Sequence, residues 1–291
     1  MKKYSSYKKW LAVGIILLFV GTGIIPSTAQ NIVKPSLLLN GKILYVGGSG
    51  PGNYSKIQDA VDNASNGDTV YVFDDSSPYI ENIIINKSIN LTGENSYSTI
   101  IENSYRSGLI KIISDNVTIS GFTLQNFLKW GVYCSGKNFV ISHNRIIDDE
   151  GMGIVSRASN VKIFNNEFTC FHDTALDIWD GDNIDIYRNN FTECIAPFYL
   201  SFTTRTHVYE NNFLSYKNAF LYWDGEFSVA ISPSKTKFYQ NYWYQPRVLP
   251  KLIFGGVIID LTWIFNFPFG IMFPWILVDS NPAIEPYNIG R

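Results

Sequence analysis

Short segments in which apolar and polar residues alternate recur along the chain. The starts of six such segments are 22, 22, 23, 22 and 30 residues apart: Val117, Phe139, Val161, Ile184, Thr206 and Thr236. A further segment from Ser88, 29 residues before Val117, fits the same pattern. Alternation with a period of two predicts β-strands, and a near-constant period of this length predicts a solenoid. We expect an all-β chain: a right-handed parallel β-helix of about seven turns, each of roughly 22 residues.

Aligning the segments places similar residues in columns. Stacked turns lie about 4.8 Å apart, so each inward residue packs on its equivalent above and below. Two columns are apolar: Leu124, Ile146, Phe168, Phe191, Phe213 and Trp243, and then Ile119, Ile141, Ile163, Ile186, Val208 and Phe238. A third column is asparagine: Asn144, Asn166, Asn189, Asn211 and Asn241. We expect these amides to hydrogen-bond along the column, and these residues to supply the left-handed backbone of a corner.

Both ends of a β-helix need covers, because an open end exposes strand edges and core. Between Tyr54 and Ala64 the apolar residues fall at i, i+3, i+4 and i+7, which predicts a short helix that caps the first turn. The strand 69–73 then begins the first turn. The strongly apolar tail is interrupted by Asp260 and Pro268, so a cap over the last turn is favoured over a membrane anchor. Attachment of this tail to a membrane or a partner stays open.

The chain begins with features of an export signal. Lysines precede an apolar run, and small residues at 27–29 suit a signal peptidase. We expect a signal peptide at 1–29, a linker at 30–42, the β-helix domain at 43–250 and an apolar cap or tail at 251–291. An uncleaved anchor is the alternative. Either way, we expect the domain outside the cytoplasm, secreted or on the cell surface.

The composition argues against nucleic acid as a partner, and the chain has 3 cysteines. The formal charge of −2 argues against nucleic acid, which needs a strongly basic surface. The positions of Cys170 and Cys194 nearly match in adjacent turns, so these two could form a disulfide, while Cys134 is expected to be a small buried residue.

The segments IQDAVDNASNGDTVYV and IENIIINKSINLTGENSYSTII resemble the start of the pectin lyase-like β-helix superfamily. The later units resemble the repeats of NosD-type and carbohydrate-binding, sugar-hydrolase β-helix families, and the tail is similar to the ends of secreted archaeal members. The resemblance covers about Ile43 to Trp243 and implies the fold more than the chemistry, because one fold hosts many functions.

These families imply two activities, but this chain has only part of the residues that each activity needs. The lid helix is similar to that of pectin methylesterases, and Phe171-His172-Asp173-Thr174 resembles the first catalytic element of that family. The second element has no counterpart, because Cys194 to Ser201 contains no carboxylate. The NosD resemblance implies a role in copper-enzyme maturation for some relatives. With 3 His and 3 Met, this chain is poor in copper ligands, so we do not expect copper.

A candidate site follows from a second strand in each turn, which starts near Gly131, Gly153, Ala175, Pro197 and Ala219. Alternation points the row Tyr133, Val155, Asp177, Tyr199 and Leu221 outward, and the row Ser135, Arg157, Trp179, Ser201 and Trp223 after it. Aromatic rings beside carboxylates suit sugars, which present C–H faces and hydroxyls. The predicted ligand-binding residues are Tyr133, Arg157, Asp177, Trp179, Tyr199, Trp223 and Asp224.

Three functions fit this pattern. The leading hypothesis is binding of polysaccharide or glycan without catalysis. The second is a polysaccharide lyase or glycoside hydrolase that uses Asp177, Asp180 or Asp182, with Asp177–Asp180 or Asp182–Asp224 as carboxylate pairs. The third is a structural surface protein. The same three aspartates could bind Ca²⁺, although Asp-Gly and Asp-Asn at 180–183 are also ordinary turn chemistry.

Overall fold

The computed structural model describes residues 41–289, apart from 104–106, 149, 171–173, 195, 215–228, 232–234, 244–249 and 261–269. It describes the backbone alone at 148, 170, 196, 229–231, 251–260 and 270–277. The expected signal peptide lies outside the described residues, and so does the expected linker up to residue 40. All of the described residues belong to one compact unit.

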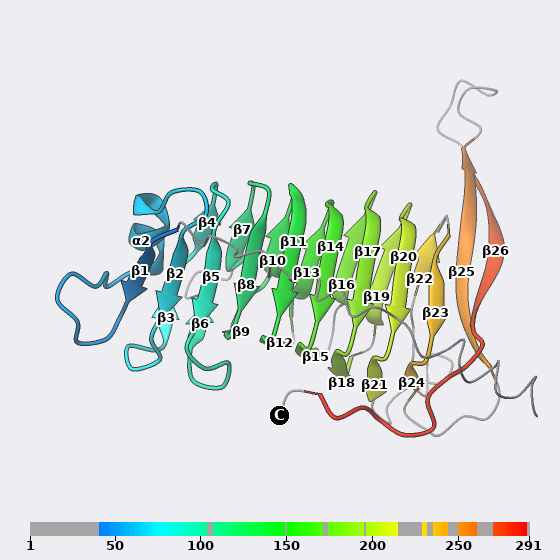
Figure 1. Cartoon of the computed structure of the whole chain (residues 1–291). Helices are drawn as coiled ribbons and strands as arrows, with labels where there is room; N and C mark the ends of the chain where they lie inside the picture. The colour runs from blue at the N-terminus through cyan, green and yellow to red at the C-terminus, as the bar shows by residue number, and fades with distance from the viewer. Residues whose placement is uncertain are drawn as a thin grey trace, which may run out of the picture. The chain divides into compact units, whose positions relative to one another are not determined.

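The chain forms a parallel β-helix whose turns each contribute strands to three faces (Figure 1). The first face is built from β1 (Ile43–Val46), β2 (Thr69–Val72), β5 (Asn90–Gly93), β8 (Val117–Ser120), β11 (Lys137–Ser142), β14 (Ser159–Phe164), β17 (Asp182–Tyr187), β20 (Thr204–Tyr209) and β23 (Lys237–Tyr239). The second face is built from β3 (Tyr79–Ile80), β6 (Ile100–Glu102), β9 (Thr123–Gln125), β12 (Arg145–Asp148), β15 (Glu167–Cys170), β18 (Asn190–Thr192), β21 (Asn212–Leu214) and β24 (Tyr242–Trp243). The third face is built from β4 (Ile83–Ile85), β7 (Ile110–Ile112), β10 (Trp130–Cys134), β13 (Met152–Ser156), β16 (Thr174–Trp179), β19 (Ala196–Ser201) and β22 (Val229–Ile231).

The strand register confirms the repeat from Val117 onward. Phe139 pairs with Val117 and Val161, and the later turns continue in the same alignment. The earlier unit differs by one residue, because Leu91 pairs with Ile119 and the spacing is therefore 28 residues. A spacing of 29 would have turned the apolar side chains of this strand outward, since a slip of one residue exchanges the two faces.

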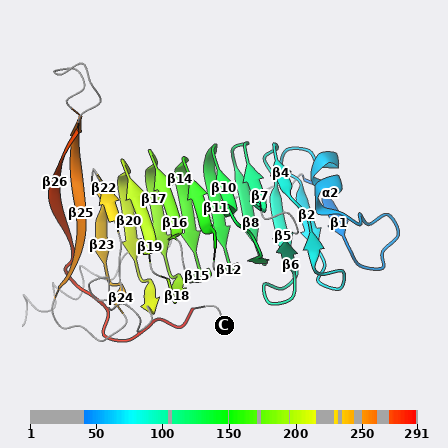
Figure 2. The same cartoon turned by 180° about the vertical axis from the view of Figure 1, so that it is seen from behind.

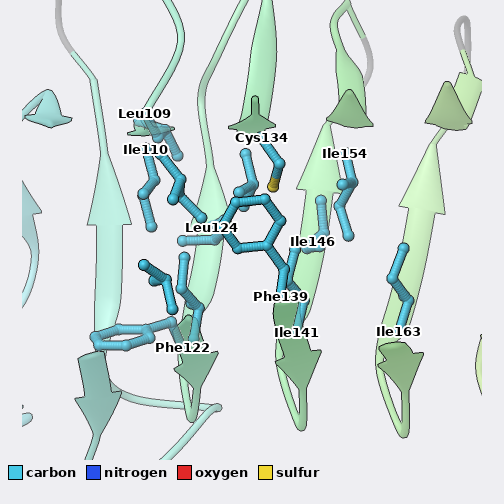
Figure 3. Close-up of a cluster of buried hydrophobic side chains, with 14 of the residues drawn as sticks. Leu109, Ile110, Phe122, Leu124, Cys134, Phe139, Ile141, Ile146, Ile154 and Ile163 are labelled. Carbon is cyan, nitrogen blue, oxygen red and sulfur yellow. The ribbon is translucent and has the colours of Figure 1, made fainter. Parts of the chain in front are cut away.

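The interior is filled by the predicted apolar columns, and Figure 3 shows a part of it. Ile119, Ile141 and Ile163 are fully buried in successive turns. In the aromatic column, the rings of Phe168 and Phe191 stack with centroids 5.0 Å apart. Each turn thereby buries apolar surface that it could not bury alone, which explains why the fold requires many turns.

The asparagine column forms a buried hydrogen-bond ladder, as predicted. The side-chain amide of Asn166 donates to Oδ1 of Asn189 at 3.0 Å and to two backbone carbonyls. However, the expectation that these residues carry the left-handed backbone is wrong. The residue before each one does so instead, with φ between 52° and 57°: His143, Asn165, Arg188, Glu210 and Gln240. The preceding residue turns the corner, and this leaves the ladder amide free to point inward.

The predicted lid helix is confirmed as α2 (Ile57–Asn63), which buries Ile57, Ala60 and Val61 against the first turns. The carboxylate of Glu81 accepts hydrogen bonds from the backbone N–H groups of Ile57 and Gln58, at 2.8 and 3.0 Å. These contacts satisfy donors that the start of a helix leaves unpaired.

At the other end, the apolar tail caps the β-helix with an antiparallel hairpin of β25 (Lys251–Asp260) and β26 (Gly270–Asp279). β25 pairs with β22, and β26 pairs with β23. The hairpin rises beyond the ends of the neighbouring strands in both views (Figures 1 and 2). None of the helices in the described part of the chain is long and apolar enough to span a membrane.

The cysteines have different environments. Cys134 is free and fully buried, and burial raises the pKa of its thiol. Cys194 is disulfide-bonded. Its expected partner is Cys170, whose side chain is outside the described part of the structure.

Candidate functional site

The third face presents the outward row that the sequence predicts as far as Tyr199, although Val155 within it is buried. The predicted continuation is wrong, because Tyr199 pairs with Val229 instead of Leu221, and Ser201 pairs with Ile231 instead of Trp223. Tyr133 pairs with Val155, Val155 with Asp177, and Asp177 with Tyr199. The intervening residues point inward, because Val132, Ile154, Leu176 and Phe198 are fully buried. In the next row, Trp179 pairs with Ser201, and Ser201 is buried instead of exposed.

Three of the predicted residues form one cluster on β16 and β19, which we call the Trp179 cluster (Asp177, Trp179 and Tyr199). The indole Nε1 of Trp179 donates a hydrogen bond to Oδ1 of Asp177 at 2.5 Å. The rings of Trp179 and Tyr199 lie 5.6 Å apart with an interplanar angle of 36°. All three side chains are half-buried, so each keeps an accessible surface while its orientation is fixed.

The other predicted ligand-binding residues lie further along the third face or outside the described residues. Tyr133 lies two turns from Asp177 and contacts the ring of Trp130, at a centroid distance of 5.4 Å. Arg157 is exposed just after β13. Trp223 and Asp224 lie outside the described residues.

The candidate catalytic aspartates do not share one surface. Asp180 is exposed and has a left-handed backbone, with φ of 53°, at the turn between β16 and β17. Asp182 begins β17, on the first face. Its carboxylate accepts hydrogen bonds from Thr204 Oγ1 at 2.5 Å and Arg205 Nε at 2.8 Å. These bonds hold the pKa of Asp182 well below its usual range. Asp182 is therefore an anion at neutral pH and does not suit the role of general acid.

No metal site is formed by these aspartates. Within the part of the chain that the structure describes, no three His, Cys, Asp or Glu side chains lie close enough together to hold a metal ion. Asp177, Asp180 and Asp182 therefore do not form such a group.

The outer surface of the first face carries an aromatic stack that sequence reasoning did not single out. Phe164, Tyr187, Tyr209 and Tyr239 stack in successive turns, with centroids 4.9 to 5.0 Å apart. Burial raises the pKa of Tyr209 to about 12, and nearby Asp185 adds to the shift. The Asp185 carboxylate lies 3.2 Å from Nδ1 of His207. A regular run of Phe and Tyr at matching positions of each repeat is the signal that would have revealed this stack.

A pocket of about 630 Å³ was also missed. We call it the corner pocket, because it lies over the asparagine ladder where the first face bends into the second. Arg145, Glu167, Arg188 and Glu210 line it, together with the loop residue Tyr97 and the C-terminal residue Tyr287. A charged residue next to the ladder asparagine in four successive turns is a sequence signal for it: Arg145 and Glu167 follow that asparagine, and Arg188 and Glu210 precede it.

Solved structures that resemble this chain include pectin methylesterases. The deglycosylated enzyme from Aspergillus niger is 17% identical, with a TM-score of 0.39 and coverage of 68% of this chain and 75% of that chain. PemA from Erwinia chrysanthemi is 13% identical, with a TM-score of 0.38 and coverage of 72% and 81%. A mutant pectin methylesterase in complex with a hexasaccharide is 12% identical, with a TM-score of 0.37 and coverage of 67% and 78%. No curated protein matches the chain.

A family described as "Periplasmic copper-binding protein (NosD)" matches residues 52–248. The described donors do not fit a copper ion: His143 bonds Asn165, His207 bonds Asp185 three turns away from His143, and Cys134 is a buried thiol. The family match covers more than half of the chain and follows the repeats themselves, so the chain belongs to the NosD family of periplasmic β-helix proteins, a membership that supports a location outside the cytoplasm.

Proposed function

We propose that this protein binds a polysaccharide or glycan outside the cytoplasm, without cleaving it, on the third face of its β-helix. The observation that carries the proposal is the Trp179 cluster. Trp179 is fixed by its hydrogen bond to Asp177, and its ring lies beside that of Tyr199. A rigid aromatic surface next to a carboxylate matches a sugar ring, which offers a C–H face for stacking and hydroxyls for hydrogen bonding.

The arrangement along the helix axis suits an extended ligand. Tyr133 and Tyr199 occupy the same outward row three turns apart. Turns spaced by about 4.8 Å place these rings roughly 14 Å apart. Exposed Arg157 lies between the two aromatic positions in sequence and extends the polar part of the surface. A chain of several sugar units fits this surface better than a single small molecule does.

Binding is favoured over hydrolysis by the state of the carboxylates. A glycosidase needs two carboxyl groups across one bond, and one of them must be protonated. Asp177 already accepts the indole N–H of Trp179, and Asp182 is paired with Arg205 on another face. Asp180 lies in an exposed turn. Asp177 and Asp182 thus each hold a neighbouring side chain in place.

Native affinity electrophoresis of the full chain tests the proposal, with gels that contain polygalacturonate, xylan, galactomannan or a mixed-linkage glucan. We expect at least one polysaccharide to retard the protein, and Trp179→Ala to abolish the retardation. Tyr45→Ala is the control, because Tyr45 is an exposed tyrosine on the first face.

Two outcomes would contradict the proposal: no retardation by any polysaccharide, or full retardation of a folded Trp179→Ala variant. Circular dichroism establishes folding. If Trp179→Ala does not fold, Tyr199→Ala tests the same cluster through its other ring. Incubation of the retarding polysaccharide with the protein should release no new reducing ends and no unsaturated products.

A further inference from the structure

The corner pocket is built from segments that are far apart in sequence. Its length follows four turns of the β-helix, from Arg145 on β12 to Glu210 after β20. Tyr97 belongs to the loop between β5 and β6, and Tyr287 belongs to the segment after β26. It lies at a corner between the first and second faces, whereas the Trp179 cluster is on the third.

The charges in the pocket are compensated in pairs. Nε of Arg145 lies 3.2 Å from a carboxylate oxygen of Glu167, and Nε of Arg188 lies 2.6 Å from one of Glu210. Two guanidinium groups and two carboxylates give the pocket no net charge from these residues. An anionic ligand would meet both glutamates, and a cationic ligand would meet both arginines, so neither is favoured by the electrostatic field.

The same pairs leave hydrogen-bonding capacity available. Each arginine uses Nε for its glutamate, and its two terminal amines have no partner among the described residues. A guanidinium carries five N–H donors, and a carboxylate has about four acceptor positions. Glu167 also accepts the hydroxyl of Tyr97 at 3.0 Å. The pocket therefore presents fixed donors and fixed acceptors side by side, which is what a hydroxyl group needs, because it both donates and accepts.

Both end segments of the pocket are held in place. The guanidinium of Arg145 lies 4.4 Å from the centre of the Tyr97 ring. At the other end, Tyr287 and Asn212 exchange two hydrogen bonds of 2.7 Å, between the Asn212 side chain and the Tyr287 backbone. The Tyr287 hydroxyl donates to the carbonyl of Gln240 at 2.8 Å. A site whose walls are already ordered loses little conformational entropy on binding.

We propose that the corner pocket is a second binding site, distinct from the Trp179 cluster, that takes an uncharged saccharide. Its volume lies within the roughly 300 to 1,000 Å³ that is usual for small-ligand sites. Sugar hydroxyls bridge the terminal amines of Arg188 and Arg145 to the carboxylates of Glu210 and Glu167. The tyrosines at the two ends provide apolar ring surface.

Isothermal titration calorimetry of the full chain tests this site with uncharged gluco-, manno-, galacto-, xylo- and chito-oligosaccharides, and with galacturonate and sulfated oligosaccharides. We expect an uncharged oligosaccharide to bind, with an affinity that changes less than about twofold between low and high salt, because no net charge is neutralised. We expect Arg188→Gln and Glu210→Gln each to weaken binding by about tenfold or more, since each removes a charged partner of the bound hydroxyls.

Arg205→Gln is the matched control, because Arg205 is another exposed arginine with a left-handed backbone and an acidic partner, outside the pocket. Arg205→Gln should bind as the unaltered protein does. Trp179→Ala removes the third-face site and should keep the binding that Arg188→Gln weakens. Binding of charged saccharides alone, a steep loss of affinity with salt, no saccharide binding, or unchanged affinity in Arg188→Gln would each overturn the inference. Loss of binding in Trp179→Ala with retention in Arg188→Gln would place the ligand on the third face.

Discussion

The buried carboxylate of Asp279 accepts hydrogen bonds from both the backbone N–H and the side-chain amide of Asn241, at 3.1 and 3.0 Å. Asp279 thus takes the place that a sixth asparagine would occupy, and the hairpin that caps the β-helix also ends its asparagine ladder. The indole N–H of Trp243 donates to the same oxygen at 3.1 Å. The last residues of two buried columns therefore converge on one carboxylate.

Asp279→Ala should destabilise the protein strongly. The substitution removes the Asp279 acceptor from two buried donors, the Asn241 backbone N–H and the Trp243 indole N–H, whereas the Asn241 amide keeps the carbonyls of Val208 and Tyr239. Since an unsatisfied buried donor costs about 1–3 kcal/mol, we expect a loss of roughly 3–5 kcal/mol in the free energy of unfolding. Asp279→Asn keeps an acceptor oxygen and should cost much less. Urea unfolding measures both, with Glu285→Ala at an exposed position as the control. Equal stability of the Ala variant and the unaltered protein would show that the ladder does not depend on this carboxylate.

Phe191→Ala should reveal how much the aromatic column contributes. Phe191 is almost fully buried, and its ring stacks between Phe168 and Phe213 at 5.0 Å from each. Removing it leaves a cavity in the middle of the column, so we expect a loss of about 3–5 kcal/mol in unfolding free energy. Phe191→Leu should cost less, because it refills part of the volume. Thr169→Ala, on the outward side of β15, serves as the control and should change stability by less than about 0.5 kcal/mol. A loss in Phe191→Ala no larger than that of the control would contradict the packing account.

The tyrosine stack should make the protein less stable at high pH. Tyr209 has its pKa raised from 10.0 to about 12 in the folded chain. Between these two values the unfolded chain loses the phenolic proton while the folded chain keeps it, so stability falls as pH rises. Tyr209→Phe removes this contribution and should show a shallower decline of unfolding free energy over the same range. Denaturant unfolding at several pH values tests this prediction, and an equally steep decline in the variant would refute it.

Much of this fold follows from the sequence because every turn must bury an apolar face against the turns above and below it. An inward position such as Ile141 meets Ile119 and Ile163, so one alignment assigns the register of several strands at once. The alignment slipped by one residue at Leu91, where the connecting segment has a different length and the repeat alone does not determine the register. The left-handed backbone at the corner was predicted for the ladder asparagine, such as Asn144, but it occurs at the residue before it, such as His143. Both residue types suit a turn chemically, and only the geometry distinguishes them.

The candidate site was harder to predict for a physical reason. Alternation correctly placed Asp177 and Tyr199 in one outward row, since strand pairing follows the repeat. It did not show that Asp182 lies on a different face with Arg205 as its partner. The corner pocket also depends on Tyr287, which returns along the β-helix from the end of the chain to contact Asn212. Contacts between such distant residues leave no periodic signal.

Hydrogen–deuterium exchange with the retarding polysaccharide bound tests the central claim most directly, because it locates the ligand without any substitution. We predict slower amide exchange in β16 and β19, the strands that carry Asp177, Trp179 and Tyr199, and no change in α2 at the N-terminal end. Unchanged exchange in β16 and β19 under saturating ligand would contradict glycan binding on the third face.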